Sequence, residues 1–215
     1  MKLVDLNVTS FIQEVDSKSP APGGGSVSAL MSSMGVALAR MVGHLTVDKK
    51  KFLALDSAIQ FEFKDIISSF IVIKDALMDL IDRDTEAFNV IMKAYQMPKT
   101  TEDEVRLRNE KIQEGTVQAI MVPLKVATLS LSALHQFELI LRYQNQNTLS
   151  DLGVAVLALS SGGLGACLNI MINLPGLTDT IAKKQYQLQA EELIEDIQVI
   201  RDDLLKKVYD LMKAK

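Results

Sequence analysis

The sequence contains no tryptophan, one cysteine and two histidines among its 215 residues. With Cys167 alone, the chain cannot form an internal disulfide, and a reducing compartment is consistent with that. Cys167 lies in an apolar run, so we interpret it as a small buried residue rather than a nucleophile. His44 and His135 are far apart and lack the spacing of metal ligands, so the sequence predicts no metal site.

The chain also lacks a strong excess of charge of either sign. Its formal net charge is −4, and this argues against sequence-independent binding of nucleic acid. Lys49-Lys50-Lys51 is the densest positive cluster, which we interpret as a solvated turn, the alternative being a landing site for an anionic tail. The N-terminal residues lack the apolar stretch of a signal peptide, so a cytoplasmic location is expected.

Strand alternation, internal repeats and long linkers are absent from the sequence, whereas 48% of its residues are hydrophobic. We therefore predict one domain over residues 1–215, an all-α antiparallel bundle of about five or six long helices. Thr101 and Glu104 resemble a capping box, and Pro123 is expected to kink or divide its helix. The helical patterns cover residues 6–15, 26–44, 52–95, 102–143, 152–174 and 179–214.

Residues 152–174 carry no charge and are long enough to span a bilayer. The segment contains four glycines, two serines and two asparagines, so we interpret it as a buried central helix capped by Ser150 or Asp151. No other segment is expected to make a comparable span, and no membrane partner is predicted.

A proline- and glycine-rich stretch at residues 19–26 precedes the second helical pattern. Gly23, Gly24 and Gly25 permit unusual backbone conformations, and Ser26 follows them. One interpretation is a tight turn that starts a closely packed helix. The other is a concave surface of backbone donors at a helix N-terminus, which would bind an anionic or polar ligand. A Walker motif would need a Gly-Lys-Ser/Thr ending, and a dinucleotide-binding fingerprint would need a preceding strand.

Asp84 interrupts an apolar stripe of the long helical pattern over residues 52–95. It lies three, four or seven residues from its apolar neighbours and therefore shares their face of the helix. Those neighbours are Leu77, Leu80, Ile81, Phe88 and Ile91. Asp82, two residues away, is expected to be solvated. A carboxylate withdrawn from water has a raised pKa and could act as a general acid or base, although a structural, paired aspartate fits the same pattern.

Asn169 and Asn173 lie four residues apart on the uncharged helical pattern and share a face. Gly162, Gly165 and Ala166 lie beside or near that face. The two amides could orient a polar ring of a ligand or could satisfy neighbouring backbone groups, and the sequence favours neither alternative.

These same residues resemble the cyclodeaminase/cyclohydrolase family of folate enzymes, which includes the C-terminal half of formiminotransferase-cyclodeaminase and stand-alone bacterial relatives. The resemblance extends over roughly residues 19–179. It is carried by Pro20-Ala21-Pro22-Gly23-Gly24-Gly25-Ser26, Met41-Val42-Gly43-His44-Leu45-Thr46, Ile81-Asp82-Arg83-Asp84-Thr85-Glu86-Ala87-Phe88, Met97-Pro98-Lys99, Val122-Pro123-Leu124, Ser150-Asp151-Leu152 and Asn169-Ile170-Met171-Ile172-Asn173-Leu174.

The resemblance implies an all-α homodimer that converts 5-formiminotetrahydrofolate into 5,10-methenyltetrahydrofolate and ammonia, as in histidine degradation. Asp84 would be catalytic, Gly23, Gly24, Gly25 and Ser26 would donate backbone hydrogen bonds to the folate, and Asn169 and Asn173 would orient it. No cofactor is implied, and a formiminotransferase partner is expected on a separate chain.

Two alternatives to this interpretation remain open. One is a methenyltetrahydrofolate cyclohydrolase that forms 10-formyltetrahydrofolate. The other is a helical module that binds folate or oligomerises without catalysis.

Overall fold

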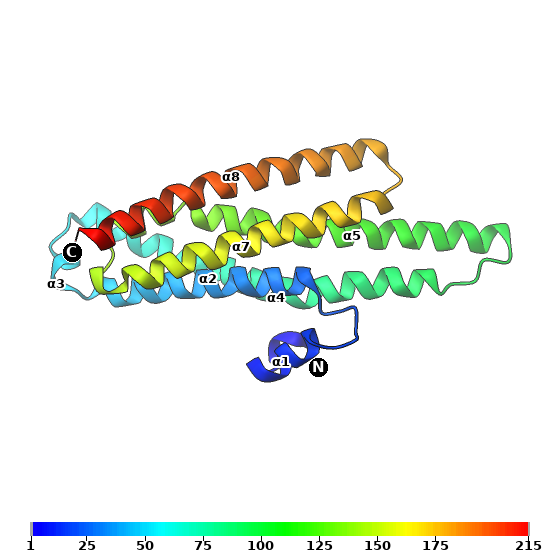
Figure 1. The fold of residues 1–215 in the computed structure, drawn as a ribbon, viewed down its shortest axis with the longest axis horizontal. Helices are drawn as coiled ribbons and strands as arrows, with labels where there is room; N and C mark the ends of the chain where they lie inside the picture. The colour runs from blue at the N-terminus through cyan, green and yellow to red at the C-terminus, as the bar shows by residue number, and fades with distance from the viewer. Residues whose placement is uncertain (1, 215) are drawn as a thin grey trace.

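The computed structural model describes residues 2–214, and all of its regular elements are helical. Five long helices lie roughly antiparallel in one bundle (Figure 1), which confirms the predicted all-α architecture. The α-helices are α1 (Val8–Val15), α2 (Gly24–Val47), α3 (Lys50–Leu53), α4 (Ser57–Tyr95), α5 (Glu102–Leu134), α6 (Phe137–Tyr143), α7 (Leu149–Asn173) and α8 (Thr180–Lys213). The 3-10 helices are η1 (Leu3–Asp5), η2 (Gln146–Thr148) and η3 (Leu174–Gly176).

Helix α2 is thin because small residues line the sides that it packs against its neighbours. Against α7, a methyl group on Gly35 would lie 2.9 Å from the backbone nitrogen of Leu159. Against α4, a methyl group on Gly43 would overlap the side chain of Ile67. The two helices therefore approach α2 more closely than larger side chains would permit, and this fixes where its N-terminus lies relative to them.

Helix boundaries agree with the sequence prediction at some places and differ at others. The predicted capping box of Thr101 and Glu104 is present at the start of α5. The pattern over residues 52–95 divides at residues 54–56, where the Asp56 side chain accepts a hydrogen bond from the Ala58 N–H and starts α4. The prediction that Ser150 or Asp151 caps α7 is wrong, because the helix begins at Leu149 and its N-cap, Thr148, makes no side-chain capping bond.

Of the two alternatives predicted for Pro123, a kink or a division of its helix, the division is wrong. Helix α5 continues through Pro123 to Leu134, and the interruption falls at His135 and Gln136 instead. Proline removes one backbone donor from a helix, so the acceptor left free needs another partner if the helix is to continue. That partner is described with the site below.

Three helical segments are long and apolar enough to cross a membrane by length and composition, namely residues 24–47, 102–143 and 146–176. The prediction that only one segment has this property is therefore wrong. Within the bundle, 50–56% of each apolar window is buried. The remaining apolar side chains of these helices lie on the surface of the single chain.

Candidate functional site

The N-terminus of α2 meets the middle of α4 at Asp84. The backbone N–H of Ser26 donates to Asp84 Oδ2 at 2.9 Å, and the Ser26 hydroxyl lies 3.2 Å from the same oxygen. A methyl group added to Gly25 would overlap the carboxyl group of Asp84 and lie 2.7 Å from Oδ2. Gly25 is therefore required by this close approach, since any side chain there would displace the carboxyl group.

Asp84 is partly buried, and burial raises the pKa of its carboxyl group above the usual value. The hydrogen bonds from the hydroxyl and backbone of Ser26 act in the opposite direction and lower that pKa. Within residues 2–214, Oδ2 receives these hydrogen bonds, whereas none is formed to Oδ1. Asp84 thus has one oxygen that is hydrogen-bonded by Ser26 and one, Oδ1, that packs against Gly25 and accepts no hydrogen bond within residues 2–214.

The first turn of α2 supplies backbone donors beside this carboxyl group. Gly23 is the N-cap and provides no side-chain cap, so the N–H groups of Gly24 and Gly25 have no helical acceptor. Gly24 is exposed, whereas Ser26 is fully buried. The placement of Ser26 changes its predicted role, because its N–H is already bonded to Asp84 and is not free to donate to a folate. The backbone donors that remain for a ligand are those of the glycines.

Asn169 on α7 lies against the N-terminus of α2, next to Gly24. Its amide nitrogen would lie 3.2 Å, and its amide oxygen 3.4 Å, from a methyl group added to Gly24. The nitrogen donates to the Gly165 carbonyl at 2.8 Å, and no residue in 2–214 donates to the oxygen. Asn169 therefore combines both alternatives left open by the sequence, since its nitrogen satisfies backbone while its oxygen is available to a ligand.

Asn173 has a structural partner that the sequence does not reveal. Its amide nitrogen donates to the Asn169 carbonyl at 2.8 Å and to the Ala119 carbonyl at 3.2 Å. Ala119 lies four residues before Pro123, so its carbonyl is the one that proline deprives of a helical donor. The side chain of Asn173 therefore stabilises α5 through Pro123, and the atom that it leaves for a ligand is its amide oxygen.

Asp82 does not lie in solvent, which corrects the prediction for this residue. It is half-buried and accepts hydrogen bonds from the backbone N–H groups of Leu3 at 2.6 Å and of Val4 at 3.4 Å. The N-terminal segment folds over α4, and these two N–H groups have no acceptor within a helix. The Asp82 carboxylate is their acceptor instead. Asp82 and Asp84 accordingly have separate partners on opposite sides of α4.

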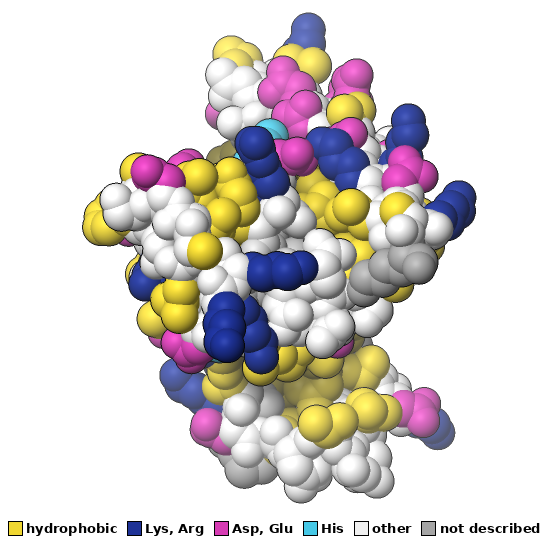
Figure 2. All heavy atoms as spheres, turned by 90° about the vertical axis from the view of Figure 1, so that its left-hand side faces the viewer, with side chains coloured by type: hydrophobic (Ala, Val, Ile, Leu, Met, Phe, Trp, Pro, Cys, Tyr) yellow, Lys and Arg dark blue, Asp and Glu magenta, His cyan; other side chains and the backbone are white. Residues whose placement is uncertain are grey.

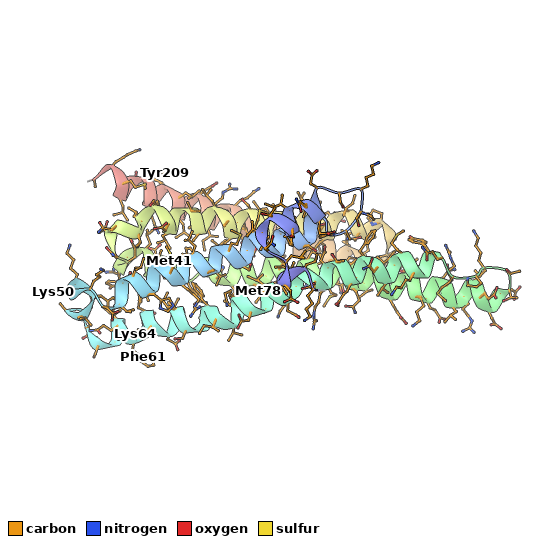
Figure 3. The ribbon with its side chains drawn as sticks, turned by 90° about the horizontal axis from the view of Figure 1, so that it is seen from below. Met41, Lys50, Phe61, Lys64, Met78 and Tyr209 are labelled. Carbon is orange, nitrogen blue, oxygen red and sulfur yellow. The ribbon has the colours of Figure 1, made fainter. Side chains whose placement is uncertain are left out.

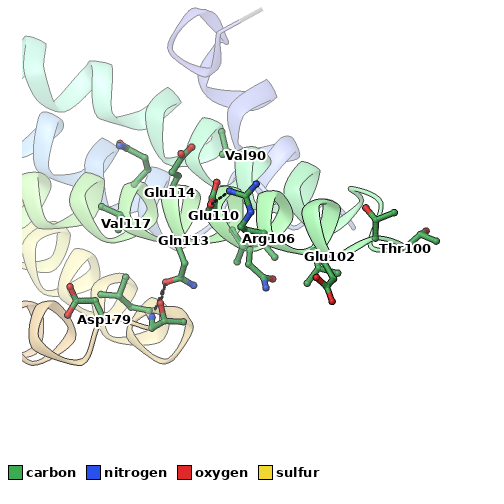
Figure 4. A pocket seen from close by; sticks show the side chains of 16 residues that line it. Val90, Thr100, Glu102, Arg106, Glu110, Gln113, Glu114, Val117 and Asp179 are labelled. Carbon is green, nitrogen blue, oxygen red and sulfur yellow. Dashed lines mark hydrogen bonds and ion pairs between the residues drawn. The ribbon is translucent and has the colours of Figure 1, made fainter.

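A hollow of about 1560 Å³ lies between the N-terminal half of α5 and the turn from α7 to α8 (Figure 4). The Gln113 side chain, which lines the hollow, forms hydrogen bonds with Gly176 and Thr178. These two residues follow Asn173 closely in the chain, so the hollow begins just beyond Asn173. Its ionisable lining residues are Glu102, Arg106, Glu110, Glu114 and Asp179, and it does not include Asp84. The excess of carboxylates makes this hollow unsuitable for an anionic ligand within a single chain.

Lys49, Lys50 and Lys51 lie at the opposite end of α2 from Asp84. Lys50 is the first residue of α3 and lies at one end of the bundle (Figure 3), and Figure 2 shows that end with several basic side chains on its surface. Helix α2 has 24 residues, so it separates the lysines from the glycines by about 36 Å. A single chain therefore cannot place this cluster beside a small ligand held at Asp84.

The remaining chemistry-bearing residues are not part of this site. Burial raises the pKa of the Cys167 thiol to about 11, so it is protonated at neutral pH, in agreement with its predicted structural role. His44 and His135 are exposed. Across residues 2–214, no group of three His, Cys, Asp or Glu side chains is arranged to hold a metal ion.

The fold and site define an all-α bundle in which a partly buried carboxyl group faces an uncapped, glycine-rich helix N-terminus. The sequence matches the family described as formiminotransferase-cyclodeaminase over residues 7–210, and the chain belongs to this family.

Named relatives agree with this membership. The chain is 36% identical over 194 residues to formimidoyltransferase-cyclodeaminase of Rattus norvegicus, a match that covers 90% of the chain but only 35% of that relative. It is 31% identical to methenyltetrahydrofolate cyclohydrolase of Methylorubrum extorquens, over 97% of the chain and 96% of the relative. The crystal structure of formiminotetrahydrofolate cyclodeaminase from Thermotoga maritima matches 98% of the chain, and the chain covers 97% of it, at 26% identity and with a TM-score of 0.77.

Proposed function

We propose that this protein is a formimidoyltetrahydrofolate cyclodeaminase, which converts 5-formiminotetrahydrofolate into 5,10-methenyltetrahydrofolate and ammonia. The observation that carries the proposal is the partly buried carboxyl group of Asp84, which is hydrogen-bonded by Ser26 and packs against the glycine turn at the N-terminus of α2. Membership of the family supplies the substrate class, and the solved relative from Thermotoga maritima bears the corresponding name.

The reaction requires one proton to leave N10 and another to reach the departing nitrogen. N10 of the folate attacks the carbon of the formimino group, which is protonated as an amidinium, and the ionised Asp84 accepts the N10 proton. The resulting tetrahedral carbon carries N5, N10 and an amino group. Protonated Asp84 then gives a proton to that amino group, the carbon–nitrogen bond breaks, ammonia leaves and the methenyl bridge forms. Asp84 returns to its ionised state, so one residue accounts for both transfers.

The raised pKa of Asp84 suits this exchange. Burial makes the carboxyl group a better base than an exposed aspartate, because its ionised form is less well solvated and takes up a proton more readily. The exposed N–H group of Gly24 and the Asn169 amide oxygen could position polar edges of the folate ring, which carries both acceptors and N–H donors.

Methenyltetrahydrofolate cyclohydrolase is the second candidate. The relative with this name matches the chain over nearly its full length, whereas formimidoyltransferase-cyclodeaminase of Rattus norvegicus is about three times longer than the matched part. In this reaction water adds to the methenyl carbon and 10-formyltetrahydrofolate forms. The intermediate is again a tetrahedral carbon between N5 and N10, so the same carboxyl group could move the protons.

A homodimer is part of the proposal, with the folate cleft completed by the second copy. Five hollows within residues 2–214, of about 250–1560 Å³, do not have Asp84 in their lining. Large apolar side chains are exposed next to the site on α7, where Leu168 is 66% and Ile172 is 76% exposed. Met34 on α2 is 60% exposed, and Met41 lies on the surface further along α2 (Figure 3). A second copy would cover this apolar surface.

Assays with purified protein separate these possibilities. Supplying 5-formiminotetrahydrofolate should produce methenyl absorbance and free ammonia, and Asp84→Asn should abolish both while preserving the helical circular-dichroism spectrum. Conversion of 5,10-methenyltetrahydrofolate alone would favour the cyclohydrolase. Turnover of neither folate would contradict both enzymatic proposals and leave the non-catalytic module. A formiminotransferase on a separate chain is proposed as the source of the formimino group.

A further inference from the structure

The hydroxyl group of Ser26 lies among more acceptors than it can serve. Its oxygen is 2.8 Å from the Ile81 carbonyl, 3.2 Å from Asp84 Oδ2 and 3.2 Å from the Thr85 hydroxyl oxygen. A serine hydroxyl has one proton to donate and two lone pairs to accept with. Only one of these neighbours can therefore receive the Ser26 proton at a time, and the other hydrogen bonds must run toward Ser26.

Two arrangements of protons fit the same heavy-atom positions. When Asp84 is ionised, the Ser26 hydroxyl donates to Oδ2, and Thr85 can donate to Ser26. When Asp84 carries a proton on Oδ2, that proton is donated to Ser26, whose own proton then goes to the Ile81 carbonyl. Rotation of the hydroxyl interconverts the two arrangements, since every distance is already within hydrogen-bond range.

We propose that Ser26 and Thr85 are positioning residues that support both protonation states of Asp84, with the Ser26 hydroxyl changing its acceptor as the carboxyl group gains and loses its proton. The role in catalysis rests on the proposed function, which requires Asp84 to change its protonation state in every turnover. The arrangement of donors around Asp84 stands independently of any substrate. Thr85 was not identified from the sequence, because nothing in its spacing shows that Ser26 of another helix packs against it.

Charged side chains do not provide an alternative explanation for the state of Asp84. Helix α2 carries no charged residue over residues 24–39, and α7 carries none over residues 152–173. On α4, Arg83 is paired with Asp79, and Asp82 is bonded to the N-terminal segment.

On α5, Gly115 packs against Ile91, and the antiparallel register therefore places Val122 level with Asp84. The nearest charged residue on that part of α5 is Lys125, which is exposed. Glu86 on α4 and Asp5 in η1 are exposed as well. Besides burial, hydroxyl and backbone donors are thus the groups that influence how Asp84 holds its proton.

The test is a titration of the Asp84 carboxyl group by carbon-13 NMR in the ligand-free protein, with the signal assigned by comparison with Asp84→Asn. Ser26→Ala should raise the midpoint by about one pH unit, because the ionised carboxyl group loses a donor. Thr85→Val should raise it by less, and Thr85→Ser should restore the original midpoint. Ser33→Ala is the matched control, since the Ser33 hydroxyl bonds only the Leu30 carbonyl of its own helix.

An unchanged midpoint in both Ser26→Ala and Thr85→Val would overturn the proposal. If Ser26→Ala does not fold, Thr85→Val and its serine counterpart decide the question. The second readout is the pH profile of folate turnover, whose acidic limb should move upward with the NMR midpoint. A moved midpoint with an unmoved profile would refute the positioning role, whereas a wild-type protein without turnover would refute the proposed function and leave the titration result valid.

Discussion

The close approach of Gly25 to Asp84 gives a sharp test of the site through Gly25→Ala. The added methyl group would overlap the carboxyl group and lie 2.7 Å from Oδ2, against about 3.4 Å for ordinary contact. Oδ2 must therefore move by about 0.7 Å or more, and the overlapped atoms by a larger distance. A displacement of about 1 Å at a reacting group can lower a rate roughly 100-fold, and overpacking of this kind typically costs about 1–3 kcal/mol of stability.

Two assays measure these effects. The rate is followed as ammonia released from 5-formiminotetrahydrofolate, and stability is followed by urea unfolding at pH 7. Gly153→Ala is the control, because a methyl group there would meet only Val208, at 3.2 Å and far from Asp84 along α7. We expect the control to keep its activity, whereas Gly25→Ala loses about two orders of magnitude in kcat/KM.

A double-mutant cycle isolates the contact itself. Asp84→Ala removes the carboxyl atoms that the new methyl group would overlap, so Gly25→Ala should destabilise the Asp84→Ala protein by less than half as much as the wild type. Additive free energies of unfolding for the two substitutions would refute the reasoning, since they would mean that Gly25 and Asp84 do not share this space.

Three further predictions concern the surrounding residues. Gly24→Val should raise KM more than it lowers kcat, because its side chain would crowd Asn169 beside the glycine donors; unchanged folate affinity in a binding titration would contradict this role. The melting temperature of Asp84→Asn minus that of the wild type should be larger at pH 8 than at pH 4. Because the pKa of Asp84 is raised, its contribution to stability is fully present below the unfolded-state pKa and is lost as pH rises through the folded-state pKa. Asparagine does not titrate and avoids this loss. If the two proteins kept the same difference in melting temperature at every pH, this prediction would be wrong. Asn173→Ala should cost about 1 kcal/mol by leaving the partly buried Ala119 carbonyl unpaired, and less in a Pro123→Ala background, where the backbone N–H is restored. Chemical denaturation of the four proteins measures the difference.

Periodicity in the sequence was sufficient for much of the fold. Long apolar stripes and short polar connections predicted the helical bundle, because helix formation and burial of one face depend on local order along the chain. The same pattern selected Asp84, which shares a face with residues such as Leu80 and Ile81 that are buried in the structure. Several boundaries were misplaced because capping and long-range packing, and not the apolar pattern, decide where a helix begins and ends.

Contacts between distant residues could not be obtained in this way. Asp82 differs from Asp84 by two positions, and its expected solvation was overturned by amides 79 and 78 residues away in the chain. Likewise, Asn173 lies 54 residues from the carbonyl that Pro123 leaves free. Neither partner leaves a local signal, since each hydrogen bond exists only after the helices have packed.

The sequence by itself determined that the chain is helical, that Asp84 lies on an apolar face and that a bare glycine turn precedes a thin helix. Tertiary structure alone decided that these features meet. It placed Gly25 against the carboxyl group and assigned the Ser26 amide to Asp84 instead of to a ligand. The physical reason is that periodicity specifies the face on which a residue lies, whereas the register between packed helices specifies what that face contacts.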